Sequence, residues 1–98
     1  MDIKVNSIKF KIDGKLESFI REKVEKLNTH YDNILSSDVM LKVENNGIEN
    51  KVAEVKLMIK GNDLYAKKQC KTFEEAVDTA TEALRKQLIK HKTKLKKK

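Results

Sequence analysis

The spacing of apolar residues changes along the chain, and this change constrains the fold more than any other feature of the sequence. Alternation of apolar and polar residues marks residues 2–6, 38–45, 51–60 and 63–71, and helical spacing marks residues 14–30 and 73–95. Alternation is typical of a strand with one buried face, and helical spacing is typical of an amphipathic helix. The predicted order of elements is therefore β-α-β-β-β-α.

Cap and turn residues separate these segments. Asp13 and Thr72 precede the two helical segments and suit N-caps, and Thr72-Phe73-Glu74-Glu75 matches a capping box. Asn45-Asn46-Gly47 and Gly61-Asn62 favour turns between the later strands. Lys68 interrupts the apolar face of the last strand, which predicts that this strand lies at an edge of the sheet.

These elements predict an α+β fold, a four-stranded mixed sheet with two helices packed on one face. The chain has no proline, no Gly/Ser-rich linker and no internal repeat. We therefore expect one domain over residues 1–98, with residues 96–98 as a frayed basic tail. The second helix should be about 35 Å long at 1.5 Å per residue. A sheet of four strands is only about 15–20 Å across, so the C-terminal end of this helix should overhang it.

The basic residues are concentrated at the C-terminal end. The 98 residues carry 22 Lys and Arg against 15 Asp and Glu, a formal net charge of +7. Residues 1–84 hold 14 basic and 15 acidic side chains, whereas residues 85–98 hold eight basic side chains and no acidic one. Lysines at a helix C-terminus complement the helix dipole, but eight of them exceed that need. The block indicates a polyanionic partner, either nucleic acid or acidic lipid.

In a helix over residues 73–95, the basic residues form two rows beside the apolar stripe. One row comprises Lys86, Lys90, Lys94 and Lys97, and the other comprises Arg85, Lys92 and Lys96. Such a basic rod suits a groove between phosphate backbones. Lys23 and Lys26 would widen this face if the two helices pack side by side. The alternative for these two residues is ordinary helix ion pairs with Glu22 and Glu25.

Several classes of function find little support. No apolar run approaches the roughly 18 residues that span a bilayer, and the N-terminus lacks the apolar region of a secretory signal. One cysteine and two histidines cannot form a usual structural zinc site. The three glycines suit turns rather than a phosphate-binding loop. We therefore expect a cytoplasmic protein that is not an enzyme, with no catalytic residue, no metal, no cofactor and no small-molecule substrate. The few aromatic residues favour recognition of structured RNA over stacking on single strands.

Five segments carry a resemblance to a known family. They are KLNTHYDNIL, VMLKVE, AEVKLMIKGNDLYAK, TFEEAVDTATEAL and RKQLIKHKTKL, within which GNDLYA and QLIKHKTKL are the most specific. Through them the whole chain resembles the ribosome hibernation promoting factors, also called ribosome-associated inhibitors or sigma-54 modulation proteins. The resemblance is to the short form of the family, which lacks the extra C-terminal dimerisation domain.

The resemblance implies a fold related to double-stranded-RNA-binding domains. It also implies binding to small-subunit ribosomal RNA in the channel between head and platform, where messenger and transfer RNA bind. Such a protein blocks translation and stabilises idle ribosomes in stress and stationary phase. The family's basic positions match here at Lys23, Lys26, Lys86, Lys90, Lys92 and Lys94. Ala83 and Ile89 depart from it, because relatives often carry Lys or Arg there, and Arg85 stands where an acidic residue is common.

The leading hypothesis is a ribosome-inactivating factor that occludes the decoding channel and is monomeric when free. Its RNA-binding residues would be Lys23, Lys26, Arg85, Lys86, Lys90, Lys92, Lys94 and Lys97. The alternative is a general structured-RNA-binding module without ribosome specificity. A protein of the membrane surface is a third hypothesis from another class. It is disfavoured because the basic block has almost no apolar face to insert into lipid.

Overall fold

The chain folds into a sheet of four strands with two helices against it. The computed structural model describes residues 1–29, 31, 33–44 and 47–96, and describes side chains as far as His91. The elements in order are β1 (Asp2–Ser7), α1 (Gly14–Glu25), the 3-10 segment η1 (Lys26–Thr29), β2 (Ile34–Val43), β3 (Lys51–Ile59), β4 (Asn62–Cys70) and α2 (Phe73–Lys96). The predicted β-α-β-β-β-α order is confirmed.

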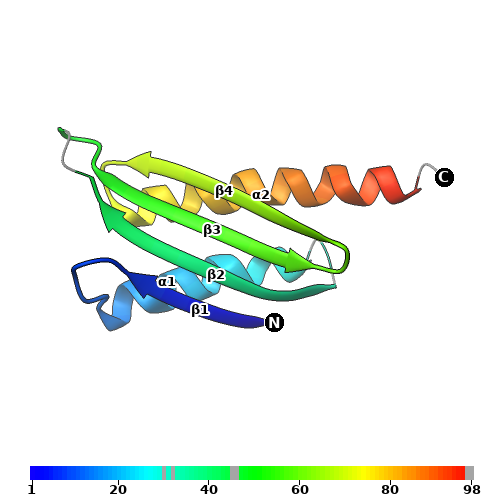
Figure 1. Ribbon diagram of the computed structural model, residues 1–98, viewed down its shortest axis with the longest axis horizontal. Helices are drawn as coiled ribbons and strands as arrows, with labels where there is room; N and C mark the ends of the chain where they lie inside the picture. Colours follow the sequence, from blue (N-terminus) through cyan, green and yellow to red (C-terminus); the bar gives the residue numbers. More distant parts are fainter. Residues whose placement is uncertain (30, 32, 45–46, 97–98) are drawn as a thin grey trace.

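The four strands lie side by side in the order β1-β2-β3-β4. β1 pairs with β2 in parallel, with Val5 opposite Val39, whereas the other two pairs are antiparallel. The sheet is therefore mixed, as the sequence predicts, and β4 lies at an edge. Figure 1 shows α1 and α2 on the same side of the sheet, so the structure has two layers.

Short polar contacts fix the start of each helix. The Asp13 side chain accepts a hydrogen bond from the backbone N–H of Leu16 at 2.8 Å, and Thr72 Oγ1 accepts one from Glu75 at 3.1 Å. Both predicted N-caps are thus confirmed, and each satisfies a backbone donor that the helix itself leaves unpaired.

The core lies between the sheet and the two helices. Val39, Val55 and Leu57 from the sheet are at most 1% exposed, and Val24 of α1 and Leu84 of α2 are fully buried. All of them belong to one cluster of buried residues. The helical stripes and the alternating strands therefore face each other, which is the arrangement that buries both apolar faces at once.

The boundaries of two elements differ from the sequence prediction. β2 begins at Ile34, four residues before the predicted start, because a bulge between Ile34 and Ser36 breaks the alternation there. Ser37 is fully buried in this segment, and its hydroxyl donates to the backbone carbonyl of Lys56 at 3.0 Å. The α-helix of α1 ends at Glu25 instead of residue 30, and the tighter turn η1 follows it.

α2 runs past the end of the sheet. Its C-terminal turns project beyond the hairpin that joins β3 to β4 (Figure 1), and the molecule measures 46 × 24 × 18 Å along its principal axes. The end that projects is the one that carries the basic block, as the sequence predicts. This geometry leaves the last turns of α2 without a strand beside them.

Candidate nucleic-acid interface

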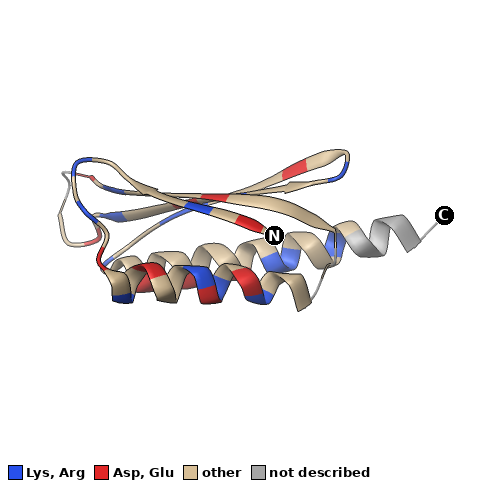
Figure 2. Cartoon of the chain, turned by 90° about the horizontal axis from the view of Figure 1, so that it is seen from below, with Lys and Arg blue, Asp and Glu red and all other residues tan. Residues whose placement is uncertain are grey.

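The charges of α2 are divided between its two halves. Glu74, Glu75, Asp78 and Glu82 occupy the first turns, and no acidic residue follows them. Figure 2 shows acidic and basic segments together in the first part of the helix layer, and only basic ones farther along α2. The C-terminal half of α2 is thus the most basic stretch of the molecule that the structure describes.

Lys86 and Lys90 lie one turn apart on this half of α2, and both are exposed. None of the ion pairs within the described part of the chain involves either lysine. Two exposed cations one turn apart can each contact a phosphate of the same backbone. These are the two predicted site residues whose surroundings best suit that role.

α1 packs beside α2 and brings Lys23 to it. Lys23 Nζ donates a hydrogen bond to Asp78 Oδ1 of α2 at 2.8 Å, and it lies 5.6 Å from the centroid of the Phe19 ring. The expected widening of the basic face by α1 is therefore geometrically possible. The alternative pairing with Glu22 or Glu25 is wrong for Lys23, because its partner lies on the other helix. No spacing rule in the sequence points to a partner 55 residues away.

Arg85 is paired within its own helix. Its Nε donates to the two carboxylate oxygens of Glu82 at 3.0 and 3.1 Å, and Nη2 also contacts Glu82. These hydrogen bonds and the negative charge raise the pKa of Arg85 above its ordinary value, so the guanidinium stays protonated. Glu82 neutralises part of its charge locally, which leaves Arg85 a weaker attractor for polyanions than the unpaired lysines.

The other predicted residues are placed only in part. Lys26 begins η1, is exposed, and lines a surface depression with Arg21 and Glu22 on the outer side of α1. The backbone of Lys92 and Lys94 is part of α2, but the side chains of these two residues are not described. Lys97 lies wholly outside the described residues. Of the frayed tail predicted for residues 96–98, only the backbone of Lys96 is described, as the last residue of α2.

A recess of about 300 Å³ lies where the β3–β4 hairpin meets α2. It is lined by Asn62, Leu64, Gln87, Lys90 and His91. Gln87 Nε2 donates to the backbone carbonyl of Tyr65 at 3.1 Å, and this contact ties α2 to the edge strand. The His91 ring meets the ring of Tyr31 edge-on, with centroids 5.6 Å apart. No local pattern in the sequence marks this recess, because only the fold brings the hairpin next to the helix.

The face of the sheet away from the helices has a different character. There Lys42 pairs with Glu54 at 3.2 Å, and Lys56 pairs with Asp63 at 3.7 Å. The hydrogen bond and charge of Glu54 raise the pKa of the Lys42 ammonium. Lys42 and Lys56 are paired with carboxylates, whereas Lys86 and Lys90 are in no ion pair within the described residues, so the C-terminal half of α2 is the better candidate for an RNA-binding surface.

The described residues offer little support for a metal site or for a membrane-spanning helix. Within the described ranges, no group of three or more His, Cys, Asp and Glu side chains is placed to hold a metal ion. Over the same residues, neither helix combines the length and apolar character that a membrane span requires.

Comparison with known proteins gives the family. Residues 3–96 match the profile of the family described as sigma 54 modulation protein / S30EA ribosomal protein. The chain belongs to this family. Two relatives share 29% identity with it, and both are named ribosome hibernation promoting factor. The one from Azotobacter vinelandii matches over 96% of this chain and 85% of its own length. The one from Escherichia coli K12 matches over 98% of both chains.

Solved structures show the same fold for this member of the S30EA family. The protein Y N-terminal domain of Thermus thermophilus superposes with a TM-score of 0.82 at 20% identity, covering 93% of this chain and 99% of that one. A ribosomal subunit interface protein from Coxiella burnetii gives a TM-score of 0.86 at 18% identity, covering 95% and 99%. The four-stranded sheet with two helices is therefore a fold that these proteins share.

Proposed function

We propose that this protein is a ribosome hibernation factor that acts in the cytoplasm on the small ribosomal subunit. It binds ribosomal RNA in the decoding channel and keeps messenger and transfer RNA out. The relatives named ribosome hibernation promoting factor match almost the entire chain, which supports a role at the ribosome. The observation that carries the RNA contact is the exposure of Lys86 and Lys90 on the basic half of α2, where neither lysine is in an ion pair within the described residues.

The mechanism we propose is steric occlusion held in place by lysine–phosphate contacts. The C-terminal half of α2 enters between phosphate backbones, with Lys86, Lys90, Lys92, Lys94 and Lys97 contacting phosphates from one helix. Lys23, Lys26 and Arg85 extend the contact to α1 and to the middle of α2. No bond is made or broken, and inhibition follows from the volume that the folded domain occupies. When the protein dissociates, counterions replace its lysines at the phosphates, and added salt favours this exchange.

Co-sedimentation tests this function. The protein is mixed with purified small subunits, large subunits or a 20-base-pair RNA duplex at near-physiological salt, and bound protein is measured in each case. We expect binding to the small subunit that excess duplex does not displace, together with loss of messenger-dependent transfer RNA binding. Equal binding to duplex and subunit would favour the general structured-RNA-binding module instead. Absence of binding both to the small subunit and to the RNA duplex would contradict both functions.

A further inference from the structure

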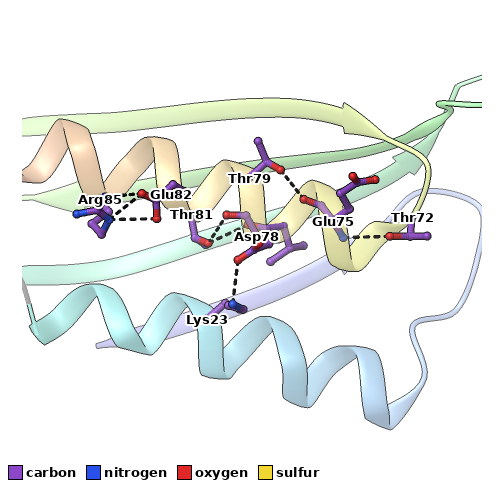
Figure 3. A network of polar contacts seen from close by, with 9 residues as sticks. Lys23, Thr72, Glu75, Asp78, Thr79, Thr81, Glu82 and Arg85 are labelled. Carbon is purple, nitrogen blue, oxygen red and sulfur yellow. Dashed lines mark hydrogen bonds and ion pairs between the residues drawn. The ribbon is translucent and has the colours of Figure 1, made fainter.

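One proposed RNA-binding cation already has a carboxylate partner from the other helix. Figure 3 shows the Lys23 ammonium of α1 directed at Asp78, one turn before Glu82 on α2. The 2.8 Å separation is that of a charge-assisted hydrogen bond. A phosphate oxygen makes the same kind of contact with an ammonium group, so Asp78 and an RNA phosphate are competitors for Lys23.

The Lys23–Asp78 contact is accessible to a competing anion. The Asp78 side chain is 61% exposed and that of Lys23 is 30% exposed. The two helices are held together underneath by buried apolar residues, among them Val24 and Val77, which are fully buried. The ion pair is therefore not needed to keep α1 beside α2, and it can open while the core stays intact.

Arg85 is a different case from Lys23. Glu82 engages Nε and Nη2 of its guanidinium, whereas no hydrogen bond within the described residues involves Nη1. The planar guanidinium group can therefore keep Glu82 and still donate to a phosphate. The Lys23 ammonium also has N–H donors that Asp78 leaves free, but its charge is concentrated on one nitrogen that lies 2.8 Å from the Asp78 carboxylate. The competition at Lys23 is therefore one of charge, because a phosphate that approaches this ammonium is repelled by Asp78.

We infer that Asp78 is an internal competitor for RNA phosphate at Lys23 and limits the affinity of the RNA-binding surface. This inference rests on the proposed function, because it assumes that Lys23 contacts RNA. Lys86 and Lys90, which are in no ion pair within the described residues, bind first. They raise the effective concentration of nearby phosphates, which then displace Asp78. Asp78 thereby weakens a complex that must later dissociate when the ribosome returns to work.

The test compares two variants that remove the same charge from α2. Asp78→Asn frees Lys23, whereas Glu74→Gln removes an exposed carboxylate nearer the start of the helix that is in no described ion pair. Binding to purified small subunits is measured by fluorescence titration at fixed salt. In the wild type, the cost of displacing the surface ion pair offsets part of the binding free energy. Asp78→Asn removes this cost and should therefore tighten binding about two- to fivefold. Glu74→Gln should change binding less, because salt screens the more distant charge.

Two further variants separate competition from other effects. In a Lys23→Gln background, the gain from Asp78→Asn should fall to that of Glu74→Gln, because no ammonium remains to be freed. Asp78→Glu keeps the carboxylate and should bind like the wild type. Equal effects of Asp78→Asn and Glu74→Gln would overturn the inference while leaving the proposed function intact. Weaker binding by Asp78→Asn would overturn it too, since Asp78 would then position Lys23 rather than compete for it. Failure of the wild type to bind small subunits would instead contradict the proposed function.

Discussion

Neighbouring residues of α2 have separate tasks. Leu84 is fully buried against the sheet, whereas Lys86 and Ile89 are exposed on the same helix. Stability and the proposed RNA binding therefore assign different faces of α2 to different roles, and single substitutions should separate the two. The same separation applies to Asp78, whose carboxylate contacts Lys23 rather than the core.

Leu84→Ala should lower the free energy of unfolding by about 2–5 kcal/mol, the range for truncating a leucine in a packed core. Ile89→Ala is the matched control on the same helix, because Ile89 is 41% exposed. It should change stability by less than about 0.5 kcal/mol, as most surface substitutions do. Urea denaturation of both variants measures the difference. Equal losses would mean that the C-terminal half of α2 is packed on all sides, which would contradict a free basic surface.

Glu54 on the open face of the sheet should make stability depend on pH. Burial alone would raise the pKa of its carboxyl, but hydrogen bonds from Lys42 and Tyr65 outweigh burial and lower that pKa below its ordinary value. A carboxyl whose pKa is lowered by folding adds stability above its unfolded pKa, and this contribution is lost as pH falls through the folded pKa. Glu54→Gln should therefore destabilise the protein at pH 7, and the deficit should shrink below about pH 4.

Thermal unfolding of wild type and Glu54→Gln from pH 7 to pH 2.5 measures this effect. Glu22→Gln serves as the control, because Glu22 is exposed and is in no ion pair within the described part of the chain. A stability difference for Glu54→Gln that stays constant over the whole pH range would contradict the assignment.

At the scale of the elements, the sequence predicted more of the framework than of its polar contacts. Periodicity identified every strand and helix because each has one buried face, and Asp13 and Thr72 marked the helix starts. It missed the start of β2, where the bulge after Ile34 and the buried Ser37 break the alternation. Ser37 can be buried because its hydroxyl makes a long-range hydrogen bond, and spacing along the chain cannot reveal such a bond.

The candidate site was predictable to the extent that it lies on one helix. Lys86 and Lys90 follow from helical spacing alone, and the structure leaves both exposed. The contact between Lys23 and Asp78 depends on the relative placement of α1 and α2, so no local rule finds it. Whether these residues bind RNA is a prediction that the following variants test.

The basic row of α2 should act as a unit. Changing Lys86, Lys90 and Lys94 together to Gln should abolish inhibition of translation, because three phosphate contacts are lost at once. The thermal midpoint should stay nearly unchanged, since Lys86 and Lys90 are exposed and exposed substitutions usually cost under about 0.5 kcal/mol. In vitro translation and thermal unfolding are the two measurements.

A matched triple change of Lys56, Lys60 and Lys67 to Gln removes the same charge from exposed positions on the β3–β4 hairpin. It should leave inhibition largely intact. Unfolding of the α2 triple variant would show that its lysines are structural. Similar losses of inhibition in both triple variants would show that net charge alone matters.

Across the whole molecule, charge is divided between an open sheet face with ion pairs such as Lys42–Glu54 and a helix layer whose C-terminal end is basic in sequence. The molecule is elongated, with a long dimension of 46 Å, and the C-terminal end of α2 lies at one end of it. In the mechanism we propose, this shape inserts into the decoding channel while the sheet fills its entrance, and electrostatic attraction orients the domain before contact.

Binding to small subunits should depend steeply on salt. With about six lysine–phosphate contacts, the slope of log affinity against log salt concentration should be about −4 to −6, given about 0.7–0.9 per contact. Titrations from low to moderate salt measure the slope. A slope near −1 would exclude a mode dominated by phosphate contacts, whatever the affinity at one salt concentration.

The most direct test of the central claim is radical cleavage of ribosomal RNA from defined positions on the bound protein. The chain has one cysteine, Cys70, so a Cys70→Ser background allows one iron chelate to be attached at a chosen site. Chelates at Lys90→Cys on α2 and at Lys67→Cys on β4 are compared on small subunits. We expect strong cleavage of RNA lining the messenger and transfer RNA channel from position 90 and much weaker cleavage from position 67. Strong cleavage from position 67 with none from position 90, or cleavage away from that channel, would contradict it.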